Sequence, residues 1–271
     1  MSDATTAAAT AAAAAAERLR ATAESTDLLL HTLAELEPAA VFEPSALSGW
    51  TRGHLLTHLA RNADSLVNLL TGARTGRQVP QYATPETRDA DIEAGAGRPL
   101  AEQAADLRES QRRFQDFAAG LEPEHWAAPI THRDGTVFPA WQVPGKRLIE
   151  LEYHHVDLNA GYTPAHWPEP FAVAEFQRLG ARLAARDDLP DLLLVAEDAG
   201  LRVRLGGGGG GGDSSGGDGD GGAPGLVAEG PVRALTGWLS GRSDGDGLQV
   251  HRGDEGLVDP RGALPALPPM G

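Results

Sequence analysis

The feature that most constrains the fold is a change in the sequence pattern near residue 162. Before it, apolar residues recur every three or four positions, which is the period of an amphipathic helix. Helices are therefore expected over residues 17–36, 51–70, 100–121 and 146–159. After it come three prolines within residues 164–170, and then mixed helix and strand patterns. We expect an α+β protein, with an antiparallel four-helix bundle over residues 17–163 and a smaller α/β domain over residues 164–262.

The smaller domain has a predicted order of elements. Its helices are expected over residues 171–185 and 231–240, and its strands over residues 192–195, 201–205 and 248–250. Residues 206–225 are rich in glycine, which predicts a flexible insertion. This stretch lacks the lysine and the following serine or threonine of a phosphate-binding loop. Residues 1–16, rich in alanine and threonine, are expected to form a disordered tail, and residues 263–271 a second tail.

The charge and the absence of cysteine exclude several classes of function. The 271 residues include 23 Lys and Arg against 38 Asp and Glu, a net charge of −15 without a basic stripe, so nucleic-acid binding is not expected. Neither a membrane span nor a signal peptide is predicted, and we expect a cytoplasmic monomer whose partners are small molecules. Because the chain has no cysteine, any thiol chemistry must use a thiol from outside it.

The densest group of potential metal ligands lies in the fourth expected helix. Glu150 and His154 are four residues apart and project from one face, and Asp157 follows one turn later. A carboxylate and an imidazole stacked in this way can bind one cation if a third ligand comes from another element. Glu152 and His155 form a rival pair, so spacing alone leaves the choice open. A surface Glu–His pair that binds no metal has the same spacing.

The third ligand is expected from the second helix, where His54 and His58 are also four residues apart. His58 lies beside the core-facing leucines, and His54 is nearer the start of the helix. A core histidine that only makes hydrogen bonds is the structural alternative. Two histidines and one carboxylate are typical of a catalytic zinc site that keeps one position open for water or substrate. Iron and manganese accept the same ligands.

Two stretches of the chain resemble the signatures of the mycothiol-dependent maleylpyruvate isomerases. They are Ser48-Gly-Trp-Thr-Arg-Gly-His-Leu-Leu-Thr-His58-Leu-Ala-Arg-Asn62-Ala63 and Glu150-Leu-Glu-Tyr-His154-His-Val-Asp-Leu158. The segment Val79–Arg88 also fits this family. The resemblance covers residues 17–250 apart from the glycine-rich insertion. It implies a DinB-like four-helix metalloprotein with a sterol-carrier-like α/β domain, in agreement with the expected elements.

The resemblance also implies roles for individual residues. The positions of the family's zinc ligands are occupied by His58, Glu150 and His154. Arg242 corresponds to a functional arginine of the family, which implies a catalytic role and contact with the cofactor or a substrate carboxylate. Tyr82 is expected to contact the cofactor. For Arg242, an ordinary cation at a helix C-terminus is the structural alternative.

The reaction implied by the resemblance is the zinc- and mycothiol-dependent conversion of maleylpyruvate to fumarylpyruvate in gentisate breakdown. The metal lowers the pKa of the mycothiol thiol, and the thiolate adds to the cis double bond, which can then rotate before elimination. A mycothiol S-transferase and a non-catalytic DinB-like binding protein are the alternatives. The family often has a tryptophan and a second arginine where this chain has Gly145 and Ile149, so its pocket is expected to differ in shape.

Overall fold

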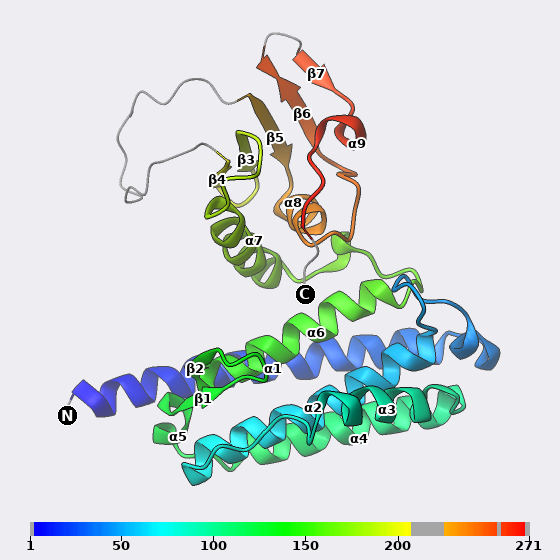
Figure 1. Ribbon diagram of the computed structural model, residues 1–271, viewed down its shortest axis with the longest axis vertical. Coiled ribbons are helices and arrows are strands. Elements are labelled where there is room, and N and C mark those ends of the chain that lie inside the picture. The colour runs from blue at the N-terminus through cyan, green and yellow to red at the C-terminus, as the bar shows by residue number, and fades with distance from the viewer. Residues whose placement is uncertain (1–2, 207–224, 254–255, 269–271) are drawn as a thin grey trace. The chain divides into compact units, whose positions relative to one another are not determined.

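The protein divides into two compact units, residues 1–162 and 163–271, which we describe separately. The computed structural model describes residues 3–206, 225–253 and 256–268. It confirms the α+β class, with a helical first unit and a sheet in the second (Figure 1). The expected flexible insertion over residues 206–225 lies outside the described residues except for its first and last glycine.

The first unit is built on four long helices (Figure 1). These are α1 (Asp3–Ala34), α2 (Arg52–Thr75), α4 (Leu100–Ala119) and α6 (Val143–Asp157). The shorter elements are α3 (Pro85–Ala96), α5 (Pro123–Ala127), β1 (Pro129–Thr131) and β2 (Val137–Pro139). Thr51 is the N-cap of α2, and the turn at residues 132–136 joins the paired strands β1 and β2. Leucines buried on facing sides of the long helices form much of the core.

The directions of the four helices follow from their side-chain contacts. α1 and α6 run parallel, because Ser25 contacts Glu152 and, further along both helices, Thr32 contacts His155. α2 and α4 are also parallel, since the connection over residues 76–99 carries α3 and returns the chain to the end where α2 began (Figure 1). The two pairs are antiparallel to each other. The antiparallel arrangement therefore holds between the pairs and not within them.

The expectation of a disordered tail over residues 1–16 is wrong from residue 3 onward, because α1 begins at Asp3. Alanine has the highest helix propensity of the amino acids, so an alanine-rich stretch readily extends a helix that follows it. Ala11 and Ala15 are buried in one cluster with Phe114 and Trp126. This packing supplies the tertiary contacts that a long, weakly amphipathic helix needs to be stable in water.

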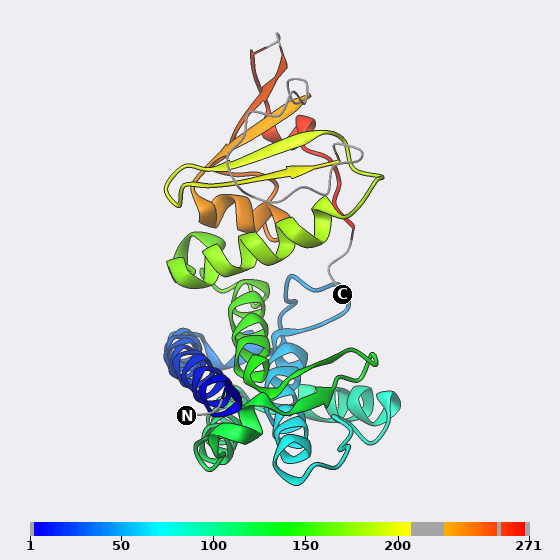
Figure 2. The ribbon, with the colours of Figure 1, turned by 90° about the vertical axis from the view of Figure 1, so that its left-hand side faces the viewer.

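The second unit is a five-stranded sheet covered on one face by two helices (Figure 2). The helices are α7 (Glu169–Ala184) and α8 (Val232–Leu239), and α9 (Pro260–Ala263) follows the sheet. The strands are β3 (Leu192–Ala196), β4 (Leu201–Leu205), β5 (Leu226–Gly230), β6 (Gln249–Arg252) and β7 (Gly256–Val258), in the order β4-β3-β5-β6-β7.

The core of the second unit lies between this sheet and its helices. Leu192, Leu194 and Ala196 are fully buried at alternate positions of β3, as expected for a strand with one covered face. Leu264 and Leu267, in the described part of the expected second tail, pack against this core. None of the helices in the described part of either unit has the length and apolarity that crossing a bilayer requires.

Candidate metal centre

The structure brings His58, Glu150 and His154 together between α2 and α6 of the first unit. One potential ligand atom of each residue lies within 4.8 Å of the other two. The Nε2 atom of His58 is 2.9 Å from Oε2 of Glu150, and Nε2 of His154 is 3.2 Å from the same oxygen. The two imidazole rings meet edge to face with their centroids 4.9 Å apart. Two ring nitrogens thus converge on one carboxylate oxygen, and we call these three residues the triad.

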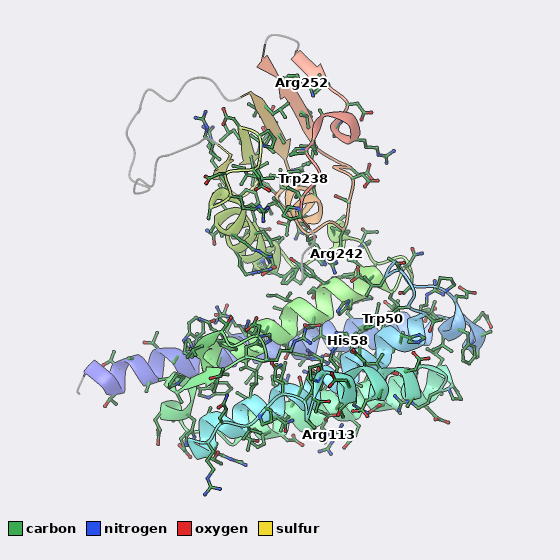
Figure 3. All side chains as sticks on the ribbon, in the orientation of Figure 1. Trp50, His58, Arg113, Trp238, Arg242 and Arg252 are labelled. Carbon is green, nitrogen blue, oxygen red and sulfur yellow. The ribbon has the colours of Figure 1, made fainter. Side chains whose placement is uncertain are left out.

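Local helix geometry explains why these residues meet. Glu150 and His154 are one turn apart on the face of α6 that packs against α2. His58 lies among the buried leucines of α2, with only 6% of its surface exposed, and its ring contacts that of Trp50 at a centroid distance of 5.6 Å (Figure 3). The triad is therefore held by two packed helices.

A second carboxylate orients one of the histidines. Oδ2 of Asp157 accepts a hydrogen bond from Nδ1 of His154 at 2.9 Å, and the side chain of Asp157 is only 6% exposed. When the ring is neutral, a proton on Nδ1 leaves the Nε2 lone pair of His154 directed at the triad. Carboxylate–histidine pairs of this kind support metal-binding histidines in many proteins.

A cation lies on the other side of the triad. Nη2 of Arg88, on α3, is 3.4 Å from Nδ1 of His58, and Nη1 of the same side chain donates to Asp89 at 2.6 Å. The side chain of Arg88 is 18% exposed. It therefore places a partly accessible positive charge at the edge of the triad.

The surroundings set the protonation of the three residues. Burial lowers the pKa of His58 despite its hydrogen bond to Glu150. Burial alone would raise the pKa of Glu150, but hydrogen bonds from His154 and His58 outweigh it and hold that pKa well below its usual range. Burial would lower the pKa of His154, whereas its bonds to Asp157 and Glu150 raise it. At neutral pH, Glu150 is therefore an anion and His58 is neutral, as metal binding requires, whereas the raised pKa of His154 means that a proton competes with the metal there.

The rival candidates in the sequence have other structural roles. His54 caps α2, because its Nδ1 accepts from the backbone N–H of Thr51, and its Nε2 lies 3.2 Å from Glu93. Glu152 projects from α6 toward α1 and accepts from Ser25 at 2.7 Å. His155 also faces α1, where its Nε2 is 2.8 Å from Thr32 Oγ1. Glu150 and His154 therefore lie on the face of α6 toward α2, and the rival pair lies on the face toward α1.

The other two candidates, Arg242 and Tyr82, belong to different units of the chain. Arg242 follows α8 in the second unit (Figure 3), where its Nη1 donates to the carbonyl oxygen of Ser240 at 3.0 Å. Tyr82 is half-buried in the segment before α3 of the first unit. Gly145 faces α1, because a Cβ atom there would lie 3.1 Å from Arg18 Cδ. A larger residue at position 145 would therefore contact α1.

Two arginines near the triad received no role in the sequence interpretation. Arg88 stands at the end of a segment that was noted only for its family resemblance. Arg147 is fully buried one turn before Glu150 on α6. The spacing to Glu150 was visible in the sequence, but a charged side chain is normally expected at the surface.

Comparisons with known proteins match the domain that holds the triad. The profile of the mycothiol maleylpyruvate isomerase N-terminal domain matches residues 22–159, just over half of the chain and all three triad positions. Sequence comparison with curated proteins gives no significant match. A crystal structure of the mycothiol-dependent maleylpyruvate isomerase is 25% identical with a TM-score of 0.76, covering 90% of this chain and 95% of that one. A histidine-to-alanine variant of such an isomerase gives 24% identity with the same score and coverage. The chain therefore belongs to the mycothiol maleylpyruvate isomerase family, through its N-terminal domain.

Proposed function

We propose that the protein is a zinc- and mycothiol-dependent isomerase that converts maleylpyruvate to fumarylpyruvate. The observation that carries this proposal is the convergence of two imidazole nitrogens and one carboxylate oxygen within 4.8 Å. These atoms belong to the domain that matches the isomerase family. The solved structures that share the fold are named as mycothiol-dependent maleylpyruvate isomerases, which supports the same activity here.

The residues present fit a catalytic divalent metal. His58, Glu150 and His154 would hold the ion through two nitrogens and one oxygen, a donor set that zinc accepts in sites with an open position. Bound there, zinc would lower the pKa of a coordinated thiol, so that thiolate forms near neutral pH. The chain has no cysteine, so the thiol must come from a cofactor. Mycothiol is the thiol named for both the family and the related structures.

Other side chains would prepare the triad for this role. Asp157 holds His154 with its Nε2 lone pair available, and Trp50 packs against the ring of His58. The guanidinium of Arg88 lies beside His58 and supplies positive charge near a site that must accept an anionic substrate. Arg242 is proposed to bind a substrate carboxylate, for which a planar guanidinium is well suited. Tyr82 is proposed to contact mycothiol.

The test is to incubate metal-loaded protein with mycothiol and maleylpyruvate and to follow loss of the cis isomer. We expect many turnovers per mycothiol, because an isomerase regenerates the thiol. Absence of turnover, together with mycothiol adducts on other electrophiles, would refute the isomerase and support an S-transferase. His58→Ala should lose both bound metal and turnover. His54→Ala, one turn away on the same helix, is the matched control and should keep both.

A further inference from the structure

Arg147 is a buried cation in the core of the helical bundle. None of its surface is exposed. Its Nε donates to Oε1 of Gln111 at 3.1 Å, and its Nη1 donates to the carbonyl oxygen of Leu59 at 2.8 Å and to Oδ1 of Asn62 at 2.9 Å. All three acceptors are uncharged. A buried charge without an ionised partner is costly to retain, so its presence calls for a physical reason.

The contacts of Arg147 join the four long helices in one polar layer. Arg147 belongs to α6, while Leu59 and Asn62 belong to α2 and Gln111 belongs to α4. Gln111 in turn donates to Oγ1 of Thr22 on α1 at 3.2 Å. The guanidinium therefore fixes α6 against α2, the two helices that carry the triad.

This polar layer lies next to the triad. On α2, Asn62 follows His58 by one turn, and on α6, Arg147 precedes Glu150 by one turn. The two helices run antiparallel, so the guanidinium occupies the layer adjoining the triad. Burial lowers the pKa of Arg147 to about 10, and Glu150 is the carboxylate that most opposes this shift.

One buried donor of Arg147 lacks a partner among the described residues, and one oxygen of Glu150 takes no part in the histidine contacts of the triad. Nη2 of Arg147 is buried and has no hydrogen-bond partner within residues 3–206, 225–253 and 256–268. Both histidine contacts of Glu150 within the triad are made through Oε2 and neither through Oε1. Carboxylates that bind metals are usually held by a further hydrogen bond through their second oxygen.

We propose that Arg147 is a positioning residue of the metal centre. It fixes the register of α2 against α6, and its Nη2 donates to Oε1 of Glu150 when a cation binds at the triad. Arg147 makes no contact with the substrate in this assignment and acts through Glu150. The inference rests on the metal site of the proposed function, and extends it to a residue that the family signatures did not assign.

A second buried arginine supplies the control. Arg52, at the start of α2, is 8% exposed and donates to the carbonyl oxygens of Leu158 and Asn159 just beyond α6. Arg52 therefore also ties α2 to the segment after α6, but it lies on the other side of the triad and is fully hydrogen-bonded. Loss of either arginine should destabilise the bundle, whereas only loss of Arg147 should alter the metal centre.

The experiment uses cobalt(II) as the metal probe, because its visible absorption reports ligand geometry as well as binding. The full chain is prepared as wild type, Arg147→Met, Arg147→Lys and Arg52→Met. We expect Arg147→Met to bind cobalt about tenfold or more weakly, with a changed absorption spectrum. Arg147→Lys keeps the charge without the planar fork and should fall between Arg147→Met and wild type. Arg52→Met should unfold at lower temperature but keep the wild-type affinity and spectrum.

Each alternative result has a defined meaning. Wild-type affinity and spectrum in folded Arg147→Met would overturn this inference and leave the metal site intact. An equal loss of affinity in Arg52→Met would also overturn it, because general loosening of the helices would then explain the effect. If Arg147→Met does not fold, Arg147→Lys decides, and an unchanged affinity and spectrum would refute the assignment. If wild type binds no cobalt, the metal site fails and this inference fails with it.

Discussion

The hydrogen bond between Asp157 and His154 allows a quantitative test of the metal centre. Asp157→Asn keeps the size of the side chain and one acceptor oxygen but removes its charge. In the wild type, this carboxylate accepts from Nδ1 of His154 at 2.9 Å in a nearly buried position. The charge increases the electron density on the imidazole and fixes the tautomer that leaves Nε2 available. Zinc affinity should therefore fall while the helices remain folded.

The size of this effect follows from the geometry. Loss of a carboxylate that supports a metal-binding histidine typically weakens metal binding about 10- to 100-fold, or roughly 1.4 to 2.7 kcal/mol. The amide oxygen of asparagine still accepts a hydrogen bond, which favours the lower end of this range. We therefore expect about a tenfold loss at neutral pH.

The dependence on pH gives a second criterion. In the wild type, burial lowers the pKa of His154, but the bonds to Asp157 and Glu150 outweigh it and raise that pKa. Asp157→Asn lowers the pKa of His154, so protons compete less with zinc in the variant. The difference in affinity should be largest at high pH and should shrink as the pH falls.

The assay is competition for zinc against a chromophoric chelator between about pH 6 and pH 8, the range in which histidine titrates. Asp116→Asn, which alters an exposed carboxylate of α4, is the control and should leave zinc affinity unchanged. Unchanged affinity of Asp157→Asn across this range would refute the role of Asp157. A deficit that grows toward low pH would refute the argument from proton competition.

Three further predictions concern stability. Leu151→Ala removes a fully buried side chain from the core of the first unit and should lower the free energy of unfolding in urea by about 2 to 5 kcal/mol. A free energy of unfolding equal to that of the wild type within experimental error would contradict this packing. The charged form of Glu150 stabilises the fold above its ordinary pKa of 4.5, and this contribution is lost as the pH falls toward its lower folded pKa. The difference in free energy of unfolding between wild type and Glu150→Gln should therefore shrink in acid. A difference that stays constant with pH would contradict stabilisation by the charged form of Glu150. Zinc at about 100 times its Kd should stabilise wild type by about 2.7 kcal/mol in thermal unfolding, and chelator or His58→Ala should remove this gain.

Much of the fold could be predicted because amphipathic helices leave a regular apolar pattern. Where that pattern is weak, the prediction failed. α3 buries only Ile92 and Ala96 as apolar side chains, and no helix was predicted over its residues. The alanine-rich start of α1 has no polar face to define its period, so it was taken for a tail. β5 follows directly after the glycine-rich segment, where composition conceals a strand.

The triad shows a different limit of prediction from sequence. Spacing alone could not choose between Glu150 with His154 and Glu152 with His155, because both pairs fit a helix. The choice depends on which face of α6 meets α2, and packing of the whole bundle decides this. Arg147 was missed for a related reason, since its burial depends on acceptors contributed by α2 and α4.

The division into two separately packed units has a consequence for how this kind of protein can change over time. The three residues of the triad all belong to the first unit, whereas Arg242, the proposed substrate contact, belongs to the second. On the proposed function, mutations in the second unit would alter the substrates accepted without disturbing α2 and α6, which carry the triad. The same helical metal centre could in this way be combined with C-terminal units that select different substrates.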